Sequence, residues 1–295
     1  MYGIKAFSAV GGIIGKNYII SILNNALDCV VRALKHVISL FTQTPETWFQ
    51  GKFWPIMTNI NSAMQGIGLG LLVLFFAMGV MRTCSGLSDI KRPEHALKLF
   101  IRFAAAKCAV TYGLDIMLAL FRIGQGVSGK VMHIIGADFN DIFLPFGDGA
   151  LPAEIAEQIH QVKFPHDIPI WFVALIAMVV FAVMSFILIA TVYGRFFKLT
   201  MYTALAPLPL SSFAAEHTQN IGKTFLKSFC AVCLQGVIIL LAFLLSMTIM
   251  TSAEIVEGDP VTTVWNYVAR IAFQIFVLVG TVKLSDQIIR EMIGS

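Results

Sequence analysis

Charged residues are scarce in this sequence of 295 residues: Asp, Glu, Lys and Arg make up 13% of it, whereas hydrophobic residues make up 57%. Soluble domains typically contain about 25% charged and about 45–50% apolar residues. So few polar side chains cannot cover a core of this size in water, and the mean hydropathy is +0.80. The composition therefore excludes a soluble globular protein. The net charge of +4 is also too small and too scattered to indicate a dedicated nucleic-acid-binding surface.

The sequence also lacks the patterns of catalytic and cofactor sites. Its five cysteines are odd in number and lie mostly in apolar runs, which does not make a disulfide framework. The six histidines show no metal-ligand spacing. Neither a Gly-x-Ser-x-Gly elbow nor a phosphate loop ending in Gly-Lys-Ser/Thr is present. We therefore expect no enzymatic activity, no cofactor and no metal.

Two short motif-like patterns lie inside apolar runs. The glycines of residues 66–70 (Gly-Ile-Gly-Leu-Gly) favour a face for close helix packing over a nucleotide site. The Cys-Ala-Val-Cys of residues 230–233 favours packing over redox or metal chemistry. The first 16 residues show no cleavable signal peptide, so we expect the membrane segments themselves to direct insertion.

Long apolar runs dominate what is present. A bilayer core about 30 Å thick needs roughly 20 apolar residues in a helix, and only helices and closed barrels satisfy the backbone in lipid. We therefore predict an all-α fold, with an N-terminal amphipathic helical region (residues 1–55) followed by a polytopic transmembrane helical bundle (residues 56–295). The predicted spans are 56–81, 93–122, 168–193, 225–251 and 261–282, and residues 123–167 are predicted to form an outer loop.

The apolar segment 196–213 contains Pro207 and Pro209. Proline removes a backbone donor and clashes with the preceding turn, which argues against one straight helix through this pair. Broken backbone at membrane depth is tolerated only where protein or water covers it. We expect a re-entrant or interfacial hairpin here.

Lys and Arg are distributed unevenly among the connecting segments, which orients a membrane protein. Residues 82–98 and 194–227 each contain four basic residues, whereas residues 251–260 contain none and three acidic ones. The 123–167 loop is also mostly acidic. We predict a multi-pass protein of the cytoplasmic membrane, in which 82–98, 194–227 and the C-terminus are cytoplasmic and the N-terminus lies outside.

Residues 17–41 are predicted to form an amphipathic helix. Its apolar face consists of Ile20, Leu23, Leu27, Val30, Leu34, Val37 and Phe41, and its polar face of Asn25, Asp28, Arg32, Lys35 and Ser39. Such a helix can lie on a membrane surface or pack on a partner, and we favour either arrangement over a span. The following Thr44-Pro45-Glu46 predicts the start of the next helix.

The second predicted span carries charges that are costly in lipid, roughly 2.5–3.5 kcal/mol each at mid-membrane. Lys98 and Arg102 belong to a basic stripe, and Lys107 and Asp115 belong to a second stripe on another face. The first stripe either faces a bundle interior or snorkels to the headgroups, while Lys107 is too deep to snorkel easily. Lys98, Arg102 and Lys107 are therefore candidate functional residues, with a purely structural role as the alternative.

The predicted depth of Asp115 in the membrane suggests a partner for it. It lies seven residues from Arg122, and Arg270 lies nine residues from Val261 at the same predicted membrane face. At about 1.5 Å per residue, these depths agree within a few ångströms. We therefore predict an Asp115–Arg270 pair between the second and last spans. The alternative is that each charge contacts another protomer or water.

Several short motifs follow one another along the chain in a recognisable order. They are Gln43-Thr44-Pro45-Glu46-Thr47-Trp48, Arg102, Lys107-Cys108, Tyr193-Gly194-Arg195, Ala206-Pro207-Leu208-Pro209, Gly222-Lys223, Leu226-Lys227-Ser228-Phe229 and Leu234-Gln235-Gly236. In this order of features the chain resembles the TrbL/VirB-type polytopic membrane subunit of type IV secretion systems, in the compact form carried by conjugative elements of Gram-positive bacteria. The resemblance covers most of the chain and is strongest over residues 191–240.

This resemblance implies a non-enzymatic subunit of a conjugation channel, on the membrane path of single-stranded DNA bound to its relaxase, with separate ATPases supplying energy. A homo-oligomer or mixed ring with other secretion subunits is expected, with interfaces at the small residues 66–70 and 104–106. The candidate functional residues are Lys98, Arg102, Lys107, Asp115, Arg195, Pro207, Pro209 and Arg270. The alternatives are a small-solute or ion transporter, an intramembrane enzyme, and a scaffold without contact to DNA.

Overall fold

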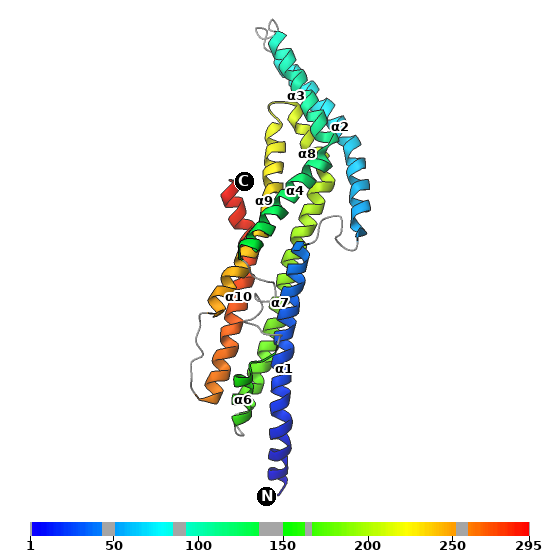
Figure 1. Cartoon of the computed structure of the whole chain (residues 1–295). Helices are drawn as coiled ribbons and strands as arrows, with labels where there is room; N and C mark the ends of the chain where they lie inside the picture. Colours follow the sequence, from blue (N-terminus) through cyan, green and yellow to red (C-terminus); the bar gives the residue numbers. More distant parts are fainter. Residues whose placement is uncertain are drawn as a thin grey trace. The chain divides into compact units, whose positions relative to one another are not determined.

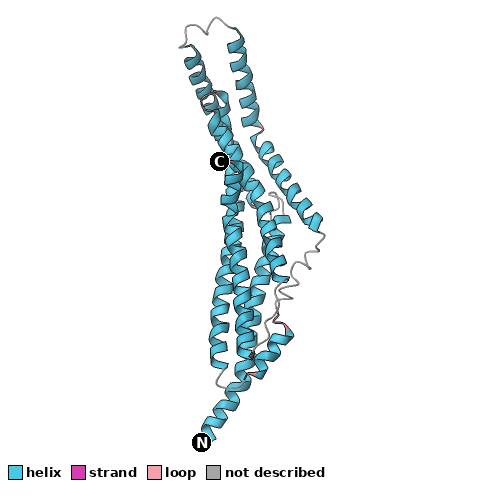
Figure 2. Ribbon diagram, turned by 90° about the vertical axis from the view of Figure 1, so that its left-hand side faces the viewer, coloured by secondary structure: helices cyan, strands magenta, loops and turns pink. Residues whose placement is uncertain are grey.

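The computed structural model describes residues 2–42, 51–84, 93–135, 150–162, 167–251 and 259–294, and all regular secondary structure within these ranges is helical (Figures 1 and 2). The elements are α1 (Tyr2–Thr42), α2 (Phe53–Cys84), α3 (Pro93–Thr111), α4 (Gly113–Ile135), α6 (Ala153–Gln161), α7 (Asp167–Leu205), α8 (Pro207–Ser211), the 3₁₀ turn η3 (Ser212–Ala214), α9 (Gln219–Thr251) and α10 (Pro260–Ile293).

Four of these helices, α2, α7, α9 and α10, are long and apolar enough to cross a membrane, and the bent pair α3–α4 makes up to five if it counts as one span. Their outer faces carry large exposed hydrophobic side chains, for example Ile67 and Leu74 on α2 and Phe186 on α7. A soluble protein rarely exposes such continuous apolar surface. The predicted all-α polytopic bundle is confirmed.

The chain folds into two compact units. Unit 1 comprises residues 1–40, 131–192 and 238–284, and unit 2 comprises residues 41–130, 193–237 and 285–295. The helices α1, α4, α7, α9 and α10 contribute residues to both units.

In unit 1, the amphipathic pattern of residues 17–41 is found in α1. Leu23, Leu27 and Leu34 on the predicted apolar face are at most 2% exposed, whereas Arg32 and Lys35 on the polar face are exposed. The apolar face is thus covered by the chain itself, and neither a membrane surface nor a partner is needed to explain it.

The predicted outer loop 123–167 is partly helical. The helix α4 continues to Ile135, and α6 lies within the remaining segment. Ile155 and Ile159 of α6 are 1% exposed, because their four-residue spacing puts both on one helix face. Two hydrogen bonds join this region to α1: the Leu151 backbone N–H donates to Asn24 Oδ1 at 2.8 Å, and Lys16 Nζ donates to the His160 carbonyl at 3.0 Å.

The prediction of one helix over residues 93–122 is wrong. The chain bends by 70° between α3 and α4 (Figure 2), and the break falls at Tyr112. No proline is present to signal it. The residues on either side of Tyr112, the β-branched Thr111 and Gly113, are weak helix formers. In addition, Leu210 of α8 packs against Gly113 in the space that a side chain would fill.

The proline pair breaks the chain where predicted, but the shape of the segment 196–213 differs. Its first half continues α7 in regular helix as far as Leu205, because proline disturbs only the turn before it. The second half forms α8 and η3, and α9 begins at Gln219. The helix start predicted at Thr44–Glu46 lies outside the described residues.

Candidate functional site

The proline-broken segment is a packed element of unit 2. The segment α8–η3 packs against both α2 and α3 (Figure 1), and Pro207, Leu210 and Ser211 are buried. Serine hydroxyl groups donate hydrogen bonds to some of its backbone carbonyls. Ser211 Oγ donates to the Leu208 carbonyl at 2.6 Å, and Ser212 Oγ donates to the Pro209 carbonyl at 2.7 Å. Broken backbone at membrane depth requires such cover.

Glycines on the neighbouring helices let this segment approach closely. A Cβ at Gly68 of α2 would lie 2.8 Å from the Pro207 carbonyl oxygen, and one at Gly113 would lie 2.9 Å from Leu210 Cδ1. By contrast, nothing lies within 4 Å of a Cβ at Gly66 or Gly70. The glycine-rich face predicted from residues 66–70 therefore serves close packing within the chain at its central glycine.

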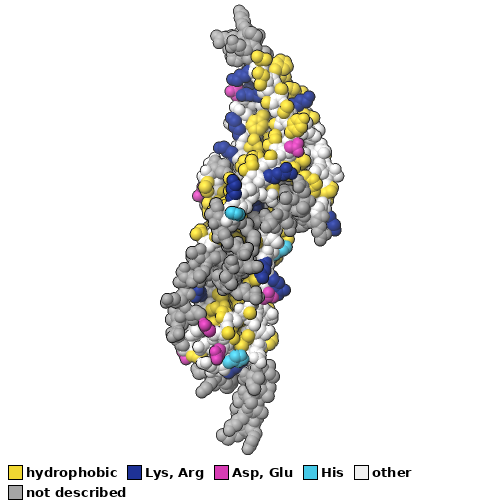
Figure 3. Space-filling model, in the orientation of Figure 1, with side chains coloured by type: hydrophobic (Ala, Val, Ile, Leu, Met, Phe, Trp, Pro, Cys, Tyr) yellow, Lys and Arg dark blue, Asp and Glu magenta, His cyan; other side chains and the backbone are white. Residues whose placement is uncertain are grey.

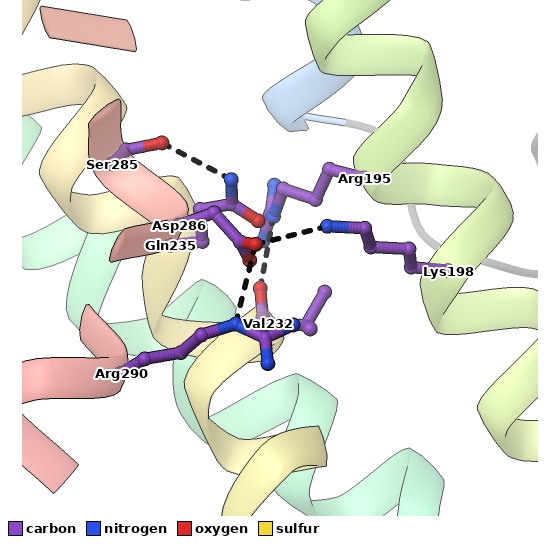
Figure 4. Close-up of polar contacts among 7 residues, drawn as sticks. All are labelled: Arg195, Lys198, Val232, Gln235, Ser285, Asp286 and Arg290. Atoms are coloured by element: carbon purple, nitrogen blue, oxygen red, sulfur yellow. Dashed lines mark hydrogen bonds and ion pairs between the residues drawn. The ribbon is translucent and has the colours of Figure 1, made fainter. Parts of the chain in front are cut away.

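Arg195, one of the predicted site residues, is buried on α7 at 5% exposure. Its Nε donates to the Val232 carbonyl of α9 at 3.0 Å (Figure 4). Its Nη2 donates to the Cys233 carbonyl of the same helix at 3.1 Å. A Cβ at Gly236 would lie 2.6 Å from Nη2. The absence of a side chain at position 236 therefore makes room for the Arg195 guanidinium. A buried arginine at position 195 thus requires a glycine at position 236.

Further polar side chains from α7, α9 and α10 surround this arginine in unit 2. Asp286 accepts hydrogen bonds from Lys198 Nζ at 3.2 Å and from Arg290 Nε at 3.3 Å. Gln235 Nε2 donates to Ser285 Oγ at 3.1 Å, with both residues buried. Figure 4 shows these side chains pointing toward one another from the three helices. We call Arg195, Lys198, Gln235, Ser285, Asp286 and Arg290 the polar cluster.

The basic residues predicted on the second span are not equivalent. Arg102 is half-buried, and its Nη1 lies 3.4 Å from Glu216 Oε2 in an ion pair with the segment after η3. Lys98 and Lys107 are exposed. They lie nine residues apart, which at 3.6 residues per turn puts them on opposite faces of α3.

The Asp115–Arg270 pair stays a prediction. Asp115 is exposed and belongs to unit 2, whereas Arg270 is half-buried and belongs to unit 1.

The described residues offer no catalytic arrangement. Among them, no group of three or more His, Cys, Asp or Glu side chains could hold a metal ion. An apolar cavity of unit 2 lies between α2, α4, α7 and α9, with Met57, Met117, Phe121 and Phe229 among its lining residues. It has no charged lining residue, so it suits packing or a lipid chain better than chemistry on a polar substrate.

The sequence analysis did not single out several polar residues that make contacts between helices in the structure. Asn61 and Gln65 of α2 hydrogen bond to backbone carbonyls of other helices, Glu216 pairs with Arg102, and Asp286 joins the polar cluster. The signal for Asn61 and Gln65 was available: two amides four residues apart at the start of an apolar run share one helix face. Nothing in the sequence identifies the carbonyls that they contact.

Comparison with models of known protein families identifies the family of the chain. The model described as TrbL/VirB6 plasmid conjugal transfer like protein matches residues 30–207, which is more than half of the sequence. No curated protein and no solved structure matches. The matched range includes the bent helix pair and Arg195 and ends at Pro207. It confirms the resemblance seen in the sequence, and the chain therefore belongs to the TrbL/VirB6 plasmid conjugal transfer family.

Proposed function

We propose that this membrane subunit of the conjugal transfer apparatus contributes to the path by which single-stranded DNA, bound to its relaxase, crosses the cytoplasmic membrane. Family membership makes the chain a component of the transfer apparatus. The step to the DNA path rests on the charge of unit 2, together with its two broken helices.

Basic side chains far outnumber acidic ones in the described part of unit 2. The basic residues are Lys52, Arg82, Lys98, Arg102, Lys107, Arg122, Lys130, Arg195, Lys198, Lys223, Lys227 and Arg290, and the acidic residues are Glu94, Asp115, Glu216, Asp286 and Glu291. Charges are close to balance in the described part of unit 1. Its basic residues are Lys5, Lys16, Arg32, Lys35, Arg270 and Lys283, and its acidic residues are Asp28, Glu154, Glu157, Asp167 and Asp259. A polyanion would therefore be attracted to unit 2.

The arrangement of these charges suits passage rather than tight binding. On the face drawn in Figure 3, Lys and Arg side chains are spread over the surface, several of them in a row along one edge, and do not form one deep patch. Phosphate contacts of this kind are non-specific and weaken as salt rises. A strand held by isolated cations is attracted without being fixed in one register, which a translocation path requires.

Lys98 and Lys107 are open to contact with such a strand. Both are exposed, and neither makes a hydrogen bond or ion pair with a described residue. Because they lie on opposite faces of α3, a strand that follows one face of the helix meets only one of them. Arg102 is held by Glu216, so we assign it a structural part in joining α3 to the segment after η3.

The same charge distribution supports the proposed orientation. The predicted cytoplasmic segments 82–98 and 194–227 both belong to unit 2, and residues 251–260 belong to unit 1 together with residues 1–40. The basic unit would then carry the cytoplasmic segments, as the positive-inside rule requires. The N-terminus lies outside and the C-terminus in the cytoplasm in this proposal.

The proposed partners are other copies of this chain, other secretion subunits and the ATPases of the apparatus. A bundle of up to five spans is small for a conduit that admits DNA, so several subunits are needed. On α2 and α3 the small residues Gly66, Gly70, Ala104 and Ala105 are exposed, whereas Gly68 and Ala106 are buried. The exposed ones remain open to close contact with a neighbouring subunit.

Neutralising one lysine at a time tests the proposal. We expect Lys98→Gln or Lys107→Gln to lower the frequency of DNA transfer about tenfold or more, as loss of phosphate attraction would, with the protein level in the membrane unchanged. Lys35→Gln, an exposed lysine of unit 1, is the matched control and should transfer normally. Normal transfer by both single variants and by the double variant would refute the DNA-path role and leave a scaffold.

A further inference from the structure

Two backbone breaks of unit 2 face the same side of α2. Asn61 and Gln65 lie four residues apart, and therefore on one face of that helix. Asn61 is 8% exposed and Gln65 is half-buried. Both side chains end in an amide that can donate hydrogen bonds. An amide without a hydrogen-bond partner is costly in an apolar span. The groups to which these two amides donate therefore indicate their role.

The first contact is at the break between α7 and α8. In a continuous helix, the Thr203 carbonyl would accept a bond from the N–H of residue 207, but Pro207 has no N–H. Asn61 Nδ2 donates to the Thr203 carbonyl at 2.8 Å instead, and it lies 3.5 Å from the Ala204 carbonyl. The side chain of Asn61 thus replaces the donor that the proline removes.

The second contact is at the break between α3 and α4. The backbone bonds at this point run from Tyr112 N to the Cys108 carbonyl and from Ile116 N to the Tyr112 carbonyl, at 2.8 and 3.0 Å. The carbonyl of Thr111 accepts from Gln65 Nε2 at 3.0 Å. Among the described residues, no backbone N–H of α4 donates a hydrogen bond to the Thr111 carbonyl.

We propose that Asn61 and Gln65 are positioning residues that hold the two broken helices against α2 by supplying the hydrogen-bond donors that the breaks remove. This role goes beyond the proposed function, because it requires no contact with DNA. Gly68 lies on the same face of α2 and brings Pro207 close enough for the short Asn61 side chain to reach. A leucine would occupy a similar volume at position 61 but would leave the Thr203 carbonyl without this donor.

Amide hydrogen exchange of the purified full chain in detergent micelles tests the role of Asn61. Asn61→Asp keeps the shape but replaces the donor by an acceptor. We expect it to speed exchange of the amides in residues 208–214 about tenfold or more, the size expected when a buried acceptor is left unsatisfied. Asn59→Asp, an exposed position on the same helix, is the matched control and should change exchange by no more than about twofold.

The decisive comparison repeats Asn61→Asp in a Pro207→Ala background. Alanine at position 207 restores an N–H that can donate to Thr203, so Asn61 should become dispensable and the double variant should exchange like Pro207→Ala alone. An equal rise in both backgrounds, or no rise in the Pro207 background, would overturn the proposal. If Asn61→Asp does not accumulate in membranes, Pro207→Ala should restore accumulation, and failure to do so would equally overturn it.

Gln65→Glu tests the second break separately. It should speed exchange of the amides in residues 112–116 and leave those of residues 208–214 unchanged, since Gln65 contacts only the Thr111 carbonyl among the backbone groups of the two breaks. Unchanged exchange at 112–116, or an equal rise in both segments, would contradict a positioning role for Gln65.

Discussion

The packing of α8 on α2 predicts a sharp difference between neighbouring glycines. In Gly68→Ala, the new Cβ would lie 2.8 Å from the Pro207 carbonyl oxygen, 3.0 Å from its carbonyl carbon and 3.1 Å from its Cβ. These are backbone and ring atoms, which cannot rotate away, so the two helices must separate. In Gly66→Ala and Gly70→Ala, the new Cβ meets nothing within 4 Å.

The two control variants isolate the cost of the clash. Replacing Gly by Ala gains up to about 1 kcal/mol in helix propensity at each of the three positions. Overpacking costs about 1–3 kcal/mol, and it applies only at Gly68. The difference between Gly68→Ala and its controls therefore equals the overpacking cost, and at about 2 °C per kcal/mol it corresponds to a melting temperature about 2–6 °C lower.

Thermal unfolding of the detergent-solubilised full chain, followed by tryptophan fluorescence, measures this difference. We expect Gly68→Ala to melt below the wild type, and Gly66→Ala and Gly70→Ala to melt at or above it. A Gly68→Ala variant as stable as its two controls would show that α8 does not pack on α2 at this point, and would refute the packing described for the broken segment.

Three further predictions concern other parts of the chain. Gly236→Ala should destabilise the protein by about 2–4 kcal/mol in the same assay, because its Cβ displaces a buried guanidinium from two carbonyls; a melting temperature equal to wild type would contradict the clash. Reversing the charge of either Asp115 or Arg270 should impair assembly, and exchanging the two residues in a double variant should restore it. A double variant that assembles no better than the single ones would refute the predicted pair. In a cysteine-free background, a membrane-impermeant thiol reagent added to intact cells should label His160→Cys but not His217→Cys; labelling at position 217 would overturn the proposed topology.

The sequence was sufficient for the helical class, the existence of the spans and the family. Apolar runs near the length of a bilayer leave helices as the structural solution, and α2, α9 and α10 contain the predicted spans. The position of the proline break was also predictable, since Pro207 cannot donate to Thr203.

The remaining features depend on contacts between distant residues. The bend at Tyr112 involves Leu210 beside Gly113 and Gln65 beside Thr111, and neither contact has a local signature. The extension of α7 past Tyr193 was missed because Arg195 looked like the charged end of a span. In the structure this arginine is buried, with two carbonyls of α9 accepting its hydrogen bonds.

Photocrosslinking during transfer tests the central claim most directly. A photoreactive residue is placed at position 98 or 107 of α3, or at Lys35 of α1 as the control, and donor cells are irradiated while DNA is being transferred. We expect the transferred strand to be captured from position 98 or position 107, only when relaxase is present, and not from position 35. Efficient transfer without capture at either α3 position would contradict a place for this subunit on the DNA path.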